Sequence, residues 1–385
     1  MLKKEERKKC VIFLRGGVKK NRIKFICNAA ERSGKYQIAY FVDDPIDHHF
    51  DANEIQVITS EELLQRDTRK QMQVIVDGSE DGDPFQWALH LGYPTENITL
   101  AEDIIKEAAN QEYQLFLEKY EHVEENVPIR IHATEIIDGL KKAGFEVVNY
   151  RIDQDDYREY LERIDYEKNY PSYLNEFGEH LPSKTVQHYV SYQLLHMNSG
   201  AVYVDIASSN SVFSDIAERL CHVKAYKQDI GYQWGIHGNR IGSFASSVPM
   251  PDHSVDYMAL HCSLEHFEGN EDFKFFQEAY RLMPVGGKVC IIPLYLADEY
   301  IIQTSPSVWL YKYTVYDKAP ELDPRAKISI NDSICQRQSK FLSVDILKEE
   351  LLEKYSDKFR IQIYYIENCR EVKGANPFAL LLEKK

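Results

Sequence analysis

Four side chains that can accept or donate a proton lie close together in the second half of the chain. They are His261, Cys262, Glu265 and His266. They follow the apolar run 255–260, which predicts a buried strand, and parallel α/β sheets bind ligands beyond the carboxyl ends of their strands. Because imidazole titrates near neutral pH, His261 and His266 are candidate general bases, with Glu265 as a neighbouring carboxylate.

Two other interpretations of this segment remain open. In the first, Glu265 and His266 only fix the loop through hydrogen bonds. In the second, His261, Glu265, His266 and Glu268 bind a metal ion. The sequence shows no further ligand set of the kind that a protein metal site needs, so we expect no metal.

Two aspartates upstream also follow predicted strands. Residues 201–204 form an apolar run that ends at Asp205, and the next strand, 222–228, ends at Asp229. Between them, the small-residue turn 207–211 leads into a helix, and such a turn places helix N-terminal amides over a ligand. An acid at the end of the second strand stands where a carboxylate binds a ribose diol.

These features, in this order and spacing, resemble the class I S-adenosylmethionine-dependent methyltransferases of the small-molecule, Leu-Glu-His type. The resemblance covers about residues 184–300 and includes Pro249-Met250-Pro251-Asp252, Asp256, Leu264-Glu265-His266 and Gly286-Gly287. It implies in-line methyl transfer from S-adenosylmethionine to an acceptor oxygen or nitrogen. The cofactor-binding residues that it implies are Asp205, Ala207, Ser208, Ser209, Ser211, Asp229, Ile230, Phe244, Ala245, His261 and Cys262.

The sequence departs from the family pattern at the turn. Ala207, Ser209 and Ser211 stand where the family has the glycines of Asp-x-Gly-x-Gly-x-Gly. A non-glycine residue held at positive φ costs about 1 kcal/mol or more, so we expect a reshaped turn with a serine hydroxyl capping the helix. Phe244 stands where many relatives have an aspartate, so adenine recognition would depend on ring packing and the Ala245 backbone.

The surrounding pattern predicts an α/β fold with two Rossmann-like parallel-sheet domains. Residues 8–110 alternate strand and helix signals and resemble the N-terminal Rossmann-like domain of some bacterial nucleotide-sugar-modifying enzymes, through Gly16-Gly17 and Phe41-Val42-Asp43-Asp44-Pro45. We expect this domain to be structural or to form homo-oligomers; a nucleotide or nucleotide-sugar site is the alternative.

The rest of the chain is expected to form three parts. Residues 111–182 are a helical, tyrosine-rich connector, and residues 183–385 are the methyltransferase domain, with a seven-stranded sheet closed by an antiparallel edge hairpin. Within it, the aromatic segment 297–343 is a lid-like insertion over the acceptor site. Tyrosine and arginine side chains there suit a small polar acceptor, such as a sugar, nucleotide-sugar or other glycan.

The composition of the chain limits the kinds of partner that the protein is expected to bind. The net charge of the 385-residue chain is −15 and it has no long basic block, which argues against nucleic acid. No apolar run approaches the roughly 20 residues of a membrane helix, so we expect no membrane span. Seven cysteines without Cys-x-x-Cys spacing predict a reducing, cytoplasmic location in a bacterial-type enzyme.

Two alternative functions remain. The same fold could act as a non-catalytic scaffold in a glycan-modifying assembly, since the turn lacks its glycines. The chemistry could instead lie in residues 8–110, in a nucleotide-sugar enzyme or an NAD-dependent oxidoreductase.

Overall fold

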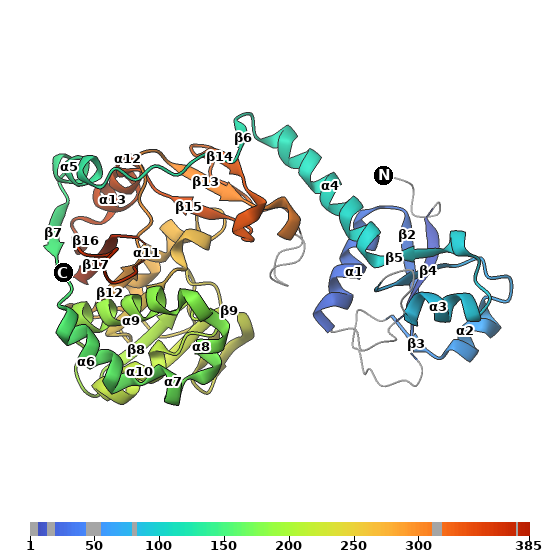
Figure 1. Ribbon diagram of the computed structural model, residues 1–385, viewed down its shortest axis with the longest axis horizontal. Coiled ribbons are helices and arrows are strands. Elements are labelled where there is room, and N and C mark those ends of the chain that lie inside the picture. Colours follow the sequence, from blue (N-terminus) through green and yellow to red (C-terminus); the bar gives the residue numbers. More distant parts are fainter. Residues whose placement is uncertain (1–6, 14–19, 44–54, 79–82, 310–317, 375) are drawn as a thin grey trace. The chain divides into compact units, whose positions relative to one another are not determined.

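The computed structural model describes residues 7–13, 20–43, 55–78, 83–309, 318–374 and 376–385. The chain forms two compact units, one of Met1–Glu121 with Pro306–Ala319 and one of His122–Ser305 with Pro320–Lys385. Each unit contains a sheet with parallel strands and covering helices (Figure 1). The predicted fold class, two Rossmann-like α/β domains, is therefore confirmed.

The smaller unit contains a five-stranded sheet in the order β3-β2-β1-β4-β5. Its strands are β1 (Lys8–Phe13), β2 (Tyr36–Val42), β3 (Val57–Ile58), β4 (Gln73–Val76) and β5 (Ile98–Leu100), and its helices are α1 (Lys20–Arg32), α2 (Ser60–Arg66), α3 (Asp83–His90) and α4 (Ala101–Lys119). All strand pairs are parallel.

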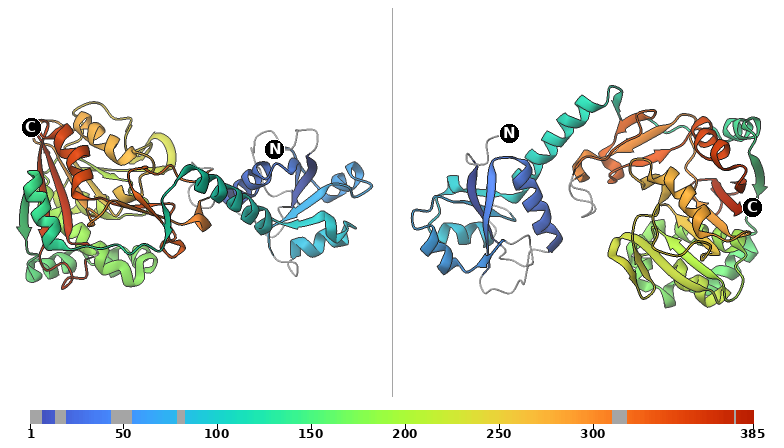
Figure 2. Two further views of the ribbon diagram at one scale, coloured as in Figure 1. Left: turned by 90° about the horizontal axis from the view of Figure 1, so that it is seen from above. Right: turned by 180° about the vertical axis from the view of Figure 1, so that it is seen from behind.

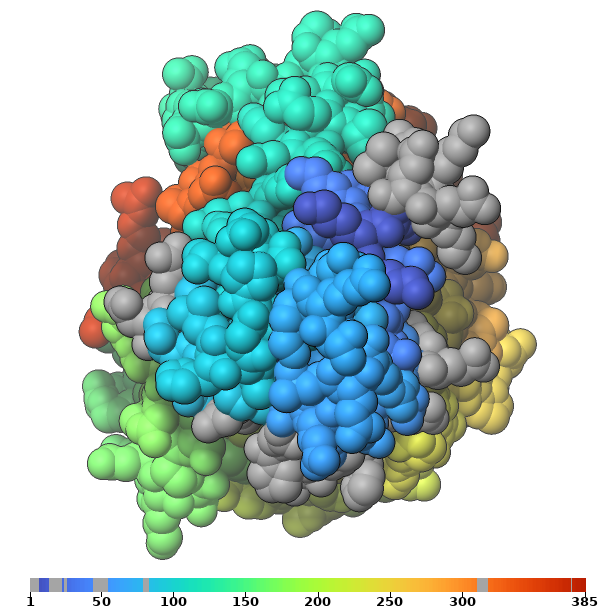
Figure 3. Space-filling model, turned by 90° about the vertical axis from the view of Figure 1, so that its right-hand side faces the viewer, coloured from blue at the N-terminus to red at the C-terminus, as the bar shows by residue number. Residues whose placement is uncertain are grey.

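Both faces of this sheet are covered, because its strands are apolar on both sides. Cys10, Ile12 and Ile75 face α1 and α4, whereas Val11 and Val74 belong to the core under α2 and α3. Figure 3 shows α2 and α3 side by side on the surface. The predicted glycine turn at Gly16-Gly17 and the pair Asp44-Pro45 lie outside the described residues.

The larger unit contains an eight-stranded sheet in the order β10-β9-β8-β11-β12-β17-β16-β7. Its strands are β7 (Glu146–Tyr150), β8 (Val202–Ile206), β9 (Lys224–His237), β10 (Arg240–Gly242), β11 (Tyr257–His261), β12 (Lys288–Ile292), β16 (Phe359–Ile366) and β17 (Phe378–Lys384). Strands β9, β8, β11 and β12 pair in parallel, and β17 runs antiparallel to both β12 and β16.

The expected antiparallel hairpin is present as β16 and β17, but it does not form the edge of the sheet. Strand β7 pairs in parallel with β16 and lies outside it (Figures 1 and 2), so the sheet has eight strands instead of seven. The Glu146 carboxylate accepts hydrogen bonds from Arg360 at 2.8 Å and Gln362 at 2.6 Å, and these contacts fix the register of the pair.

The expected connector 111–182 is therefore not a separate part. Its first residues belong to α4 in the smaller unit, and residues 122–182 belong to the larger unit. Tyr160, Tyr166 and Tyr173 are buried in one core with the sheet, which explains much of the tyrosine content of this segment. The helices of the larger unit are α5 (Ala133–Ala143), α6 (Gln154–Ile164), α7 (Tyr166–Asn169), α8 (Pro171–Phe177), α9 (Leu181–Leu195), α10 (Phe213–Cys221), α11 (Glu271–Leu282), α12 (Val344–Leu347) and α13 (Glu353–Tyr355).

The predicted insertion 297–343 is divided between the two units. Its strands β13 (Ile301–Thr304), β14 (Lys327–Ile330) and β15 (Ser339–Phe341) join β6 (Val123–Glu125) in a small sheet of the larger unit, in the order β15-β13-β14-β6. Pro306–Ala319 belongs instead to the smaller unit, where Trp309 is fully buried and packs on Phe116 of α4. Tyr311, Tyr313 and Tyr316 lie outside the described residues.

No helix within the described ranges is long and apolar enough to cross a membrane.

Candidate functional site

The turn after β8 keeps the backbone that glycine would favour. Ala207 has a φ of 50° and Ser209 a φ of 43°, so two of the three glycine positions are left-handed without glycine. The expectation that the turn would be reshaped was therefore wrong. The Ser211 hydroxyl accepts a hydrogen bond from the amide of Phe213, the first residue of α10. The N-cap residue of this helix is Val212, so the serine does not occupy the expected capping position.

Three side chains from β9 hold this strained turn in place. The Ala207 amide donates to Oε1 of buried Gln228 at 3.0 Å, and the Ser209 amide donates to Oδ2 of Asp229 at 2.9 Å. The Tyr232 hydroxyl donates to the Ser209 carbonyl. A net contribution of about 1 kcal/mol from each such hydrogen bond is enough to offset the strain of two left-handed residues. These partners come from another strand, so the local sequence did not reveal them.

Asp229 and Ile230 do not end a strand as expected, because β9 continues to His237. Both Asp229 oxygens accept backbone hydrogen bonds, from Ser209 at 2.9 Å and from Gly231 at 2.7 Å. Each carboxylate oxygen has a second acceptor position. Asp229 thus has a structural task in the turn, and its binding of a ribose diol stays a prediction.

Asp205 and His261 meet at the carboxyl ends of the neighbouring strands β8 and β11. The Oδ1 atom of Asp205 lies 3.4 Å from Nδ1 of His261, and the other ring nitrogen of His261, Nε2, lies 2.9 Å from the Ser191 hydroxyl on α9. Asp205 is only 1% exposed, yet neither of its oxygens, nor Nδ1 of His261, has a hydrogen-bond partner of normal geometry among the described residues. The hydroxyl of the fully buried Tyr203, on the same strand, also interacts with Asp205. Buried polar atoms without a partner of normal geometry are rare in native proteins.

Helix α9 lines this pair with polar side chains that the sequence did not single out. His188 is fully buried, and its ring packs edge-on against His261 at 5.1 Å. Its Nδ1 lies 2.8 Å from the Tyr166 hydroxyl. Burial, followed by the charges of His261 and Lys184, holds the pKa of His188 well below its usual value, so His188 is neutral. These residues could have been identified from the sequence, because Gln187, His188 and Ser191 stand among apolar residues in a segment that predicts a helix.

Cys262 also contacts α9. Its Sγ accepts a hydrogen bond from Nε2 of Gln187 at 3.1 Å, and its backbone φ is 49°. Burial raises the pKa of the Cys262 thiol. The side chain is therefore a thiol at neutral pH and a poor nucleophile.

Glu265 and His266 lie in the short turn Leu264–His266, which packs against β15 of the small sheet. The Nδ1 atom of His266 donates to the Gln338 carbonyl at 2.7 Å, and its Nε2 lies 3.6 Å from Glu265 Oε1. Burial raises the pKa of Glu265. Hydrogen bonding of His266 to the small sheet matches the loop-fixing interpretation of this segment.

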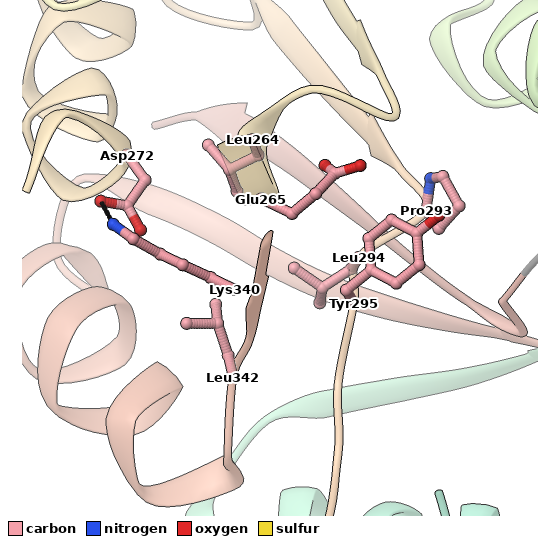
Figure 4. Close-up of a pocket in the computed structure, with 8 residues that line it drawn as sticks. All are labelled: Leu264, Glu265, Asp272, Pro293, Leu294, Tyr295, Lys340 and Leu342. Carbon is pink, nitrogen blue, oxygen red and sulfur yellow. Dashed lines mark hydrogen bonds and ion pairs between the residues drawn. The ribbon is translucent and has the colours of Figure 1, made fainter. Parts of the chain in front are cut away.

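The Glu265 carboxylate borders a narrow cavity of about 10 Å³. Figure 4 shows it turned away from the buried Lys340–Asp272 ion pair, which closes the other end at 2.7 Å. A cavity of this size holds about one water molecule. The site residues therefore form two groups: Asp205, His261 and Cys262 along α9, and Glu265 with His266 against the small sheet.

An aromatic pair occupies the position expected for adenine recognition. Half-buried Phe244, which follows β10, lies edge-on against Trp234 of β9 with ring centroids 5.4 Å apart, and Ala245 beside it is buried. Trp234 is 53% exposed, which is unusual for so large an apolar side chain. Trp234 was not among the predicted site residues, because the strand 222–228 was expected to end before it.

Within the part of the chain that the structure describes, no group of three or more His, Cys, Asp or Glu side chains is arranged to hold a metal ion.

No protein-family model and no curated protein matches the chain. Among solved structures, it is similar to a putative methyltransferase from an antibiotic biosynthesis pathway of Anabaena variabilis, at 22% identity and a TM-score of 0.24, over 27% of this chain and 43% of that one. It is also similar to the 1,6-didemethyltoxoflavin-N1-methyltransferase of Burkholderia thailandensis, solved with S-adenosylhomocysteine, at 11% identity and a TM-score of 0.37, over 62% of this chain and 93% of that one.

A putative methyltransferase of Bacillus halodurans is a further similar structure, at 17% identity and a TM-score of 0.23, over 27% of this chain and 45% of that one. The chain covers less than half of the length of the Anabaena variabilis and Bacillus halodurans structures. Similarity this low carries no argument about function, which is argued from the geometry of the site.

Proposed function

We propose that the larger unit binds S-adenosylmethionine along the carboxyl ends of β8, β9 and β11 and transfers its methyl group to an oxygen or nitrogen of a small polar acceptor. The observation that carries this proposal is the set of buried polar atoms without partners at this edge. They belong to residues that end or follow the strands, or that contact them from α9: Gln187, Asp205, Ser243, His261, Ser263 and Glu265. Burying them without a ligand or water would cost about 1–3 kcal/mol each.

The charge of the site suits this cofactor. Asp205 offers a buried carboxylate whose oxygens have no hydrogen bond of normal geometry among the described residues, and Asp229 lies on the neighbouring strand. S-adenosylmethionine carries a sulfonium and an ammonium group and no phosphate, so it needs carboxylates and no cluster of cations. A dinucleotide would require the opposite charge at the turn.

The residues of the chain act mainly by positioning. The amides of Ala207, Ser208, Ser209 and Ser211 already donate to acceptors within the protein, so the carboxylate of Asp205 is the group that holds the ligand. The Ser191 hydroxyl fixes Nε2 of His261 at 2.9 Å. When bound, S-adenosylmethionine supplies the methyl group. When the two reactants are held in the correct orientation, a large part of the activation barrier of such transfers is removed. The general-base roles of His261 and His266, with Glu265, remain part of the proposal.

One observation favours a second candidate, a non-catalytic protein of the same fold. Both oxygens of Asp229 already serve the backbone of Ser209 and Gly231, and Tyr232 covers the same turn. If Asp229 keeps these hydrogen bonds and does not bind a ribose, the site binds the cofactor weakly or not at all. Cofactor binding without methyl transfer to any acceptor would support this candidate.

The test is isothermal titration of the full chain with S-adenosylhomocysteine, with Asp205→Asn as the diagnostic variant. Asn keeps the shape and removes the charge, so we expect the affinity to fall at least tenfold. Because a buried unpaired carboxylate is costly, we also expect the variant to be as stable as the wild type or more stable in urea. Unchanged affinity in Asp205→Asn, or lost stability together with lost binding, would make Asp205 a structural residue.

A further inference from the structure

A groove of about 570 Å³ lies in the larger unit, outside the residues assigned to the cofactor. Its walls come from α6, α7, α8 and the first turns of α9, and from residues 371–373, which follow β16. Strand β16 is antiparallel to β17, which is antiparallel to β12, so β16 runs in the same direction as β12 and β11. The groove therefore opens at the carboxyl edge of the sheet, the same edge as Asp205.

The surface of the groove is mainly apolar, with polar and charged side chains among its lining residues. Its inner wall contains the rings of Tyr157 and Tyr166, with Leu161 and Leu174 beside them. Polar groups include the Tyr157 hydroxyl, 2.6 Å from the Thr185 hydroxyl, and the exposed amide of Gln154. Aromatic rings together with planar amide and carboxylate groups suit a ring that has an apolar face and hydroxyls at its edge.

The charges of the lining exclude a phosphate-bearing ligand. Three carboxylates, Asp165, Glu167 and Glu371, line the groove against two cations, Arg158 and Lys373. Arg158 is already paired with Asp155 at 2.9 Å, and Glu371 is paired with Arg151 at 3.1 Å. A phosphate or diphosphate group prefers converging cations, and here carboxylates are in excess. A neutral sugar, or one with an amine, meets no such repulsion.

We infer that this groove binds the sugar ring of the acceptor, as a neutral or amino sugar without a nucleotide. The inference rests on the proposed function, because the acceptor is the molecule that the proposed methyl transfer modifies. The groove itself contains none of the residues assigned to the cofactor. Tyr166 connects the two: it lines the groove, and its hydroxyl contacts His188, whose ring packs on His261. The buried side chains of Tyr166 and His188 thus lie between the groove and the Asp205–His261 pair.

The test is saturation-transfer NMR of the full chain with glucosamine and methyl glucoside as probes, and with uridine diphosphate as the anionic comparison. We expect saturation of the sugar ring protons and none of the uridine protons. Leu174→Trp fills the groove and should reduce the sugar signal at least fivefold, whereas Leu115→Trp, a substitution at a residue 59% exposed in the smaller unit, should leave it unchanged. Gln154→Ala, at an exposed residue, should reduce it about threefold and serves if Leu174→Trp does not fold.

Titration with S-adenosylhomocysteine on the same samples separates the two proposals. If the sugar signal depends on Leu174 or Gln154 but the chain binds no cofactor, the result would support sugar binding in the groove and contradict the proposed function. Cofactor binding with no sugar saturation, or with saturation equal in both groove variants and the wild type, would overturn the groove proposal. Saturation of the uridine protons that depends on the same residues would overturn the sugar assignment.

Discussion

At the scale of single residues, the turn 207–211 is shaped by contacts from a neighbouring strand. Ala207 and Ser209 adopt positive φ because Gln228, Asp229 and Tyr232 hold their backbone. The apolar run before Asp205 correctly predicted a buried strand, which is β8, followed by a turn of small residues. The sequence could not indicate that the left-handed backbone survives, since the stabilising partners lie about 20 residues away.

Substitution of Ser209 by glycine tests this strain. The contacts of Ser209 with Asp229 and Tyr232 use its backbone amide and carbonyl, so they remain in Ser209→Gly. Relief of the positive φ should raise the free energy of unfolding by about 1 kcal/mol in urea. Ser211→Gly is the matched control: Ser211 has no positive φ and its hydroxyl accepts a hydrogen bond from the Phe213 amide, so this variant should be destabilised. Equal effects of the two substitutions would contradict strain at Ser209.

Glu265 should make stability depend on pH. Burial raises its pKa in the folded state, so the folded protein binds this proton more tightly than the unfolded chain does. The stabilising contribution is fully present below the unfolded pKa and is lost as the pH rises through the folded pKa. We expect Glu265→Gln to match the wild type at pH 4 and to be more stable at pH 7, measured by thermal unfolding. A difference that is constant with pH would mean that this carboxyl titrates normally.

At the scale of elements, the sheet edge of the larger unit shows what sequence patterns miss. The run 145–150 reads as a strand, but its partner β16 lies more than 200 residues later, and a local pattern does not identify such a partner. The consequence is that residues 122–182, expected to be a connector, complete the sheet and cover it with α6, α7 and α8. The strands that carry Asp205 and His261 were predicted, because fully buried parallel strands have continuous apolar sequences.

Two glycines of α5 provide a test at this scale. Gly144 caps the helix with a φ of 100°, so Gly144→Ala should destabilise the larger unit by about 1 kcal/mol through backbone strain. Gly139 lies inside the helix, and an added Cβ would lie 3.4 Å from Val344, an ordinary contact. Gly139→Ala should therefore stabilise by up to about 1 kcal/mol. Urea unfolding measures both, and the same sign for both would show that the end of α5 is assigned wrongly.

At the scale of the whole molecule, the division into units does not follow chain order. Pro306–Ala319 leaves the larger unit and completes the smaller one. Trp309 is the reason: it is fully buried against Phe116, with ring centroids 4.7 Å apart, and Tyr113 also contacts it. The sequence predicted a lid at 297–343 from its many aromatic residues. Composition alone does not show in which hydrophobic core an aromatic side chain is buried.

Trp309→Ala should weaken only the smaller unit. Removal of a buried tryptophan costs about 3–5 kcal/mol. Hydrogen exchange detected by mass spectrometry should show faster exchange in β1, β4 and α4 and unchanged exchange in β8, β11 and β12. Trp234→Ala, at the exposed tryptophan of the larger unit, is the control and should leave exchange in β1 and β4 unchanged. Faster exchange in β8 and β11 of Trp309→Ala would contradict the division of the chain.

The central claim is that the carboxyl edge around Asp205 and His261 is a binding site for S-adenosylmethionine. Native mass spectrometry of the full chain mixed with S-adenosylmethionine tests it most directly, because it needs no knowledge of the acceptor. The account predicts a 1:1 complex that is much reduced in Asp205→Asn. A wild-type chain that gains no cofactor mass at millimolar concentration would contradict it.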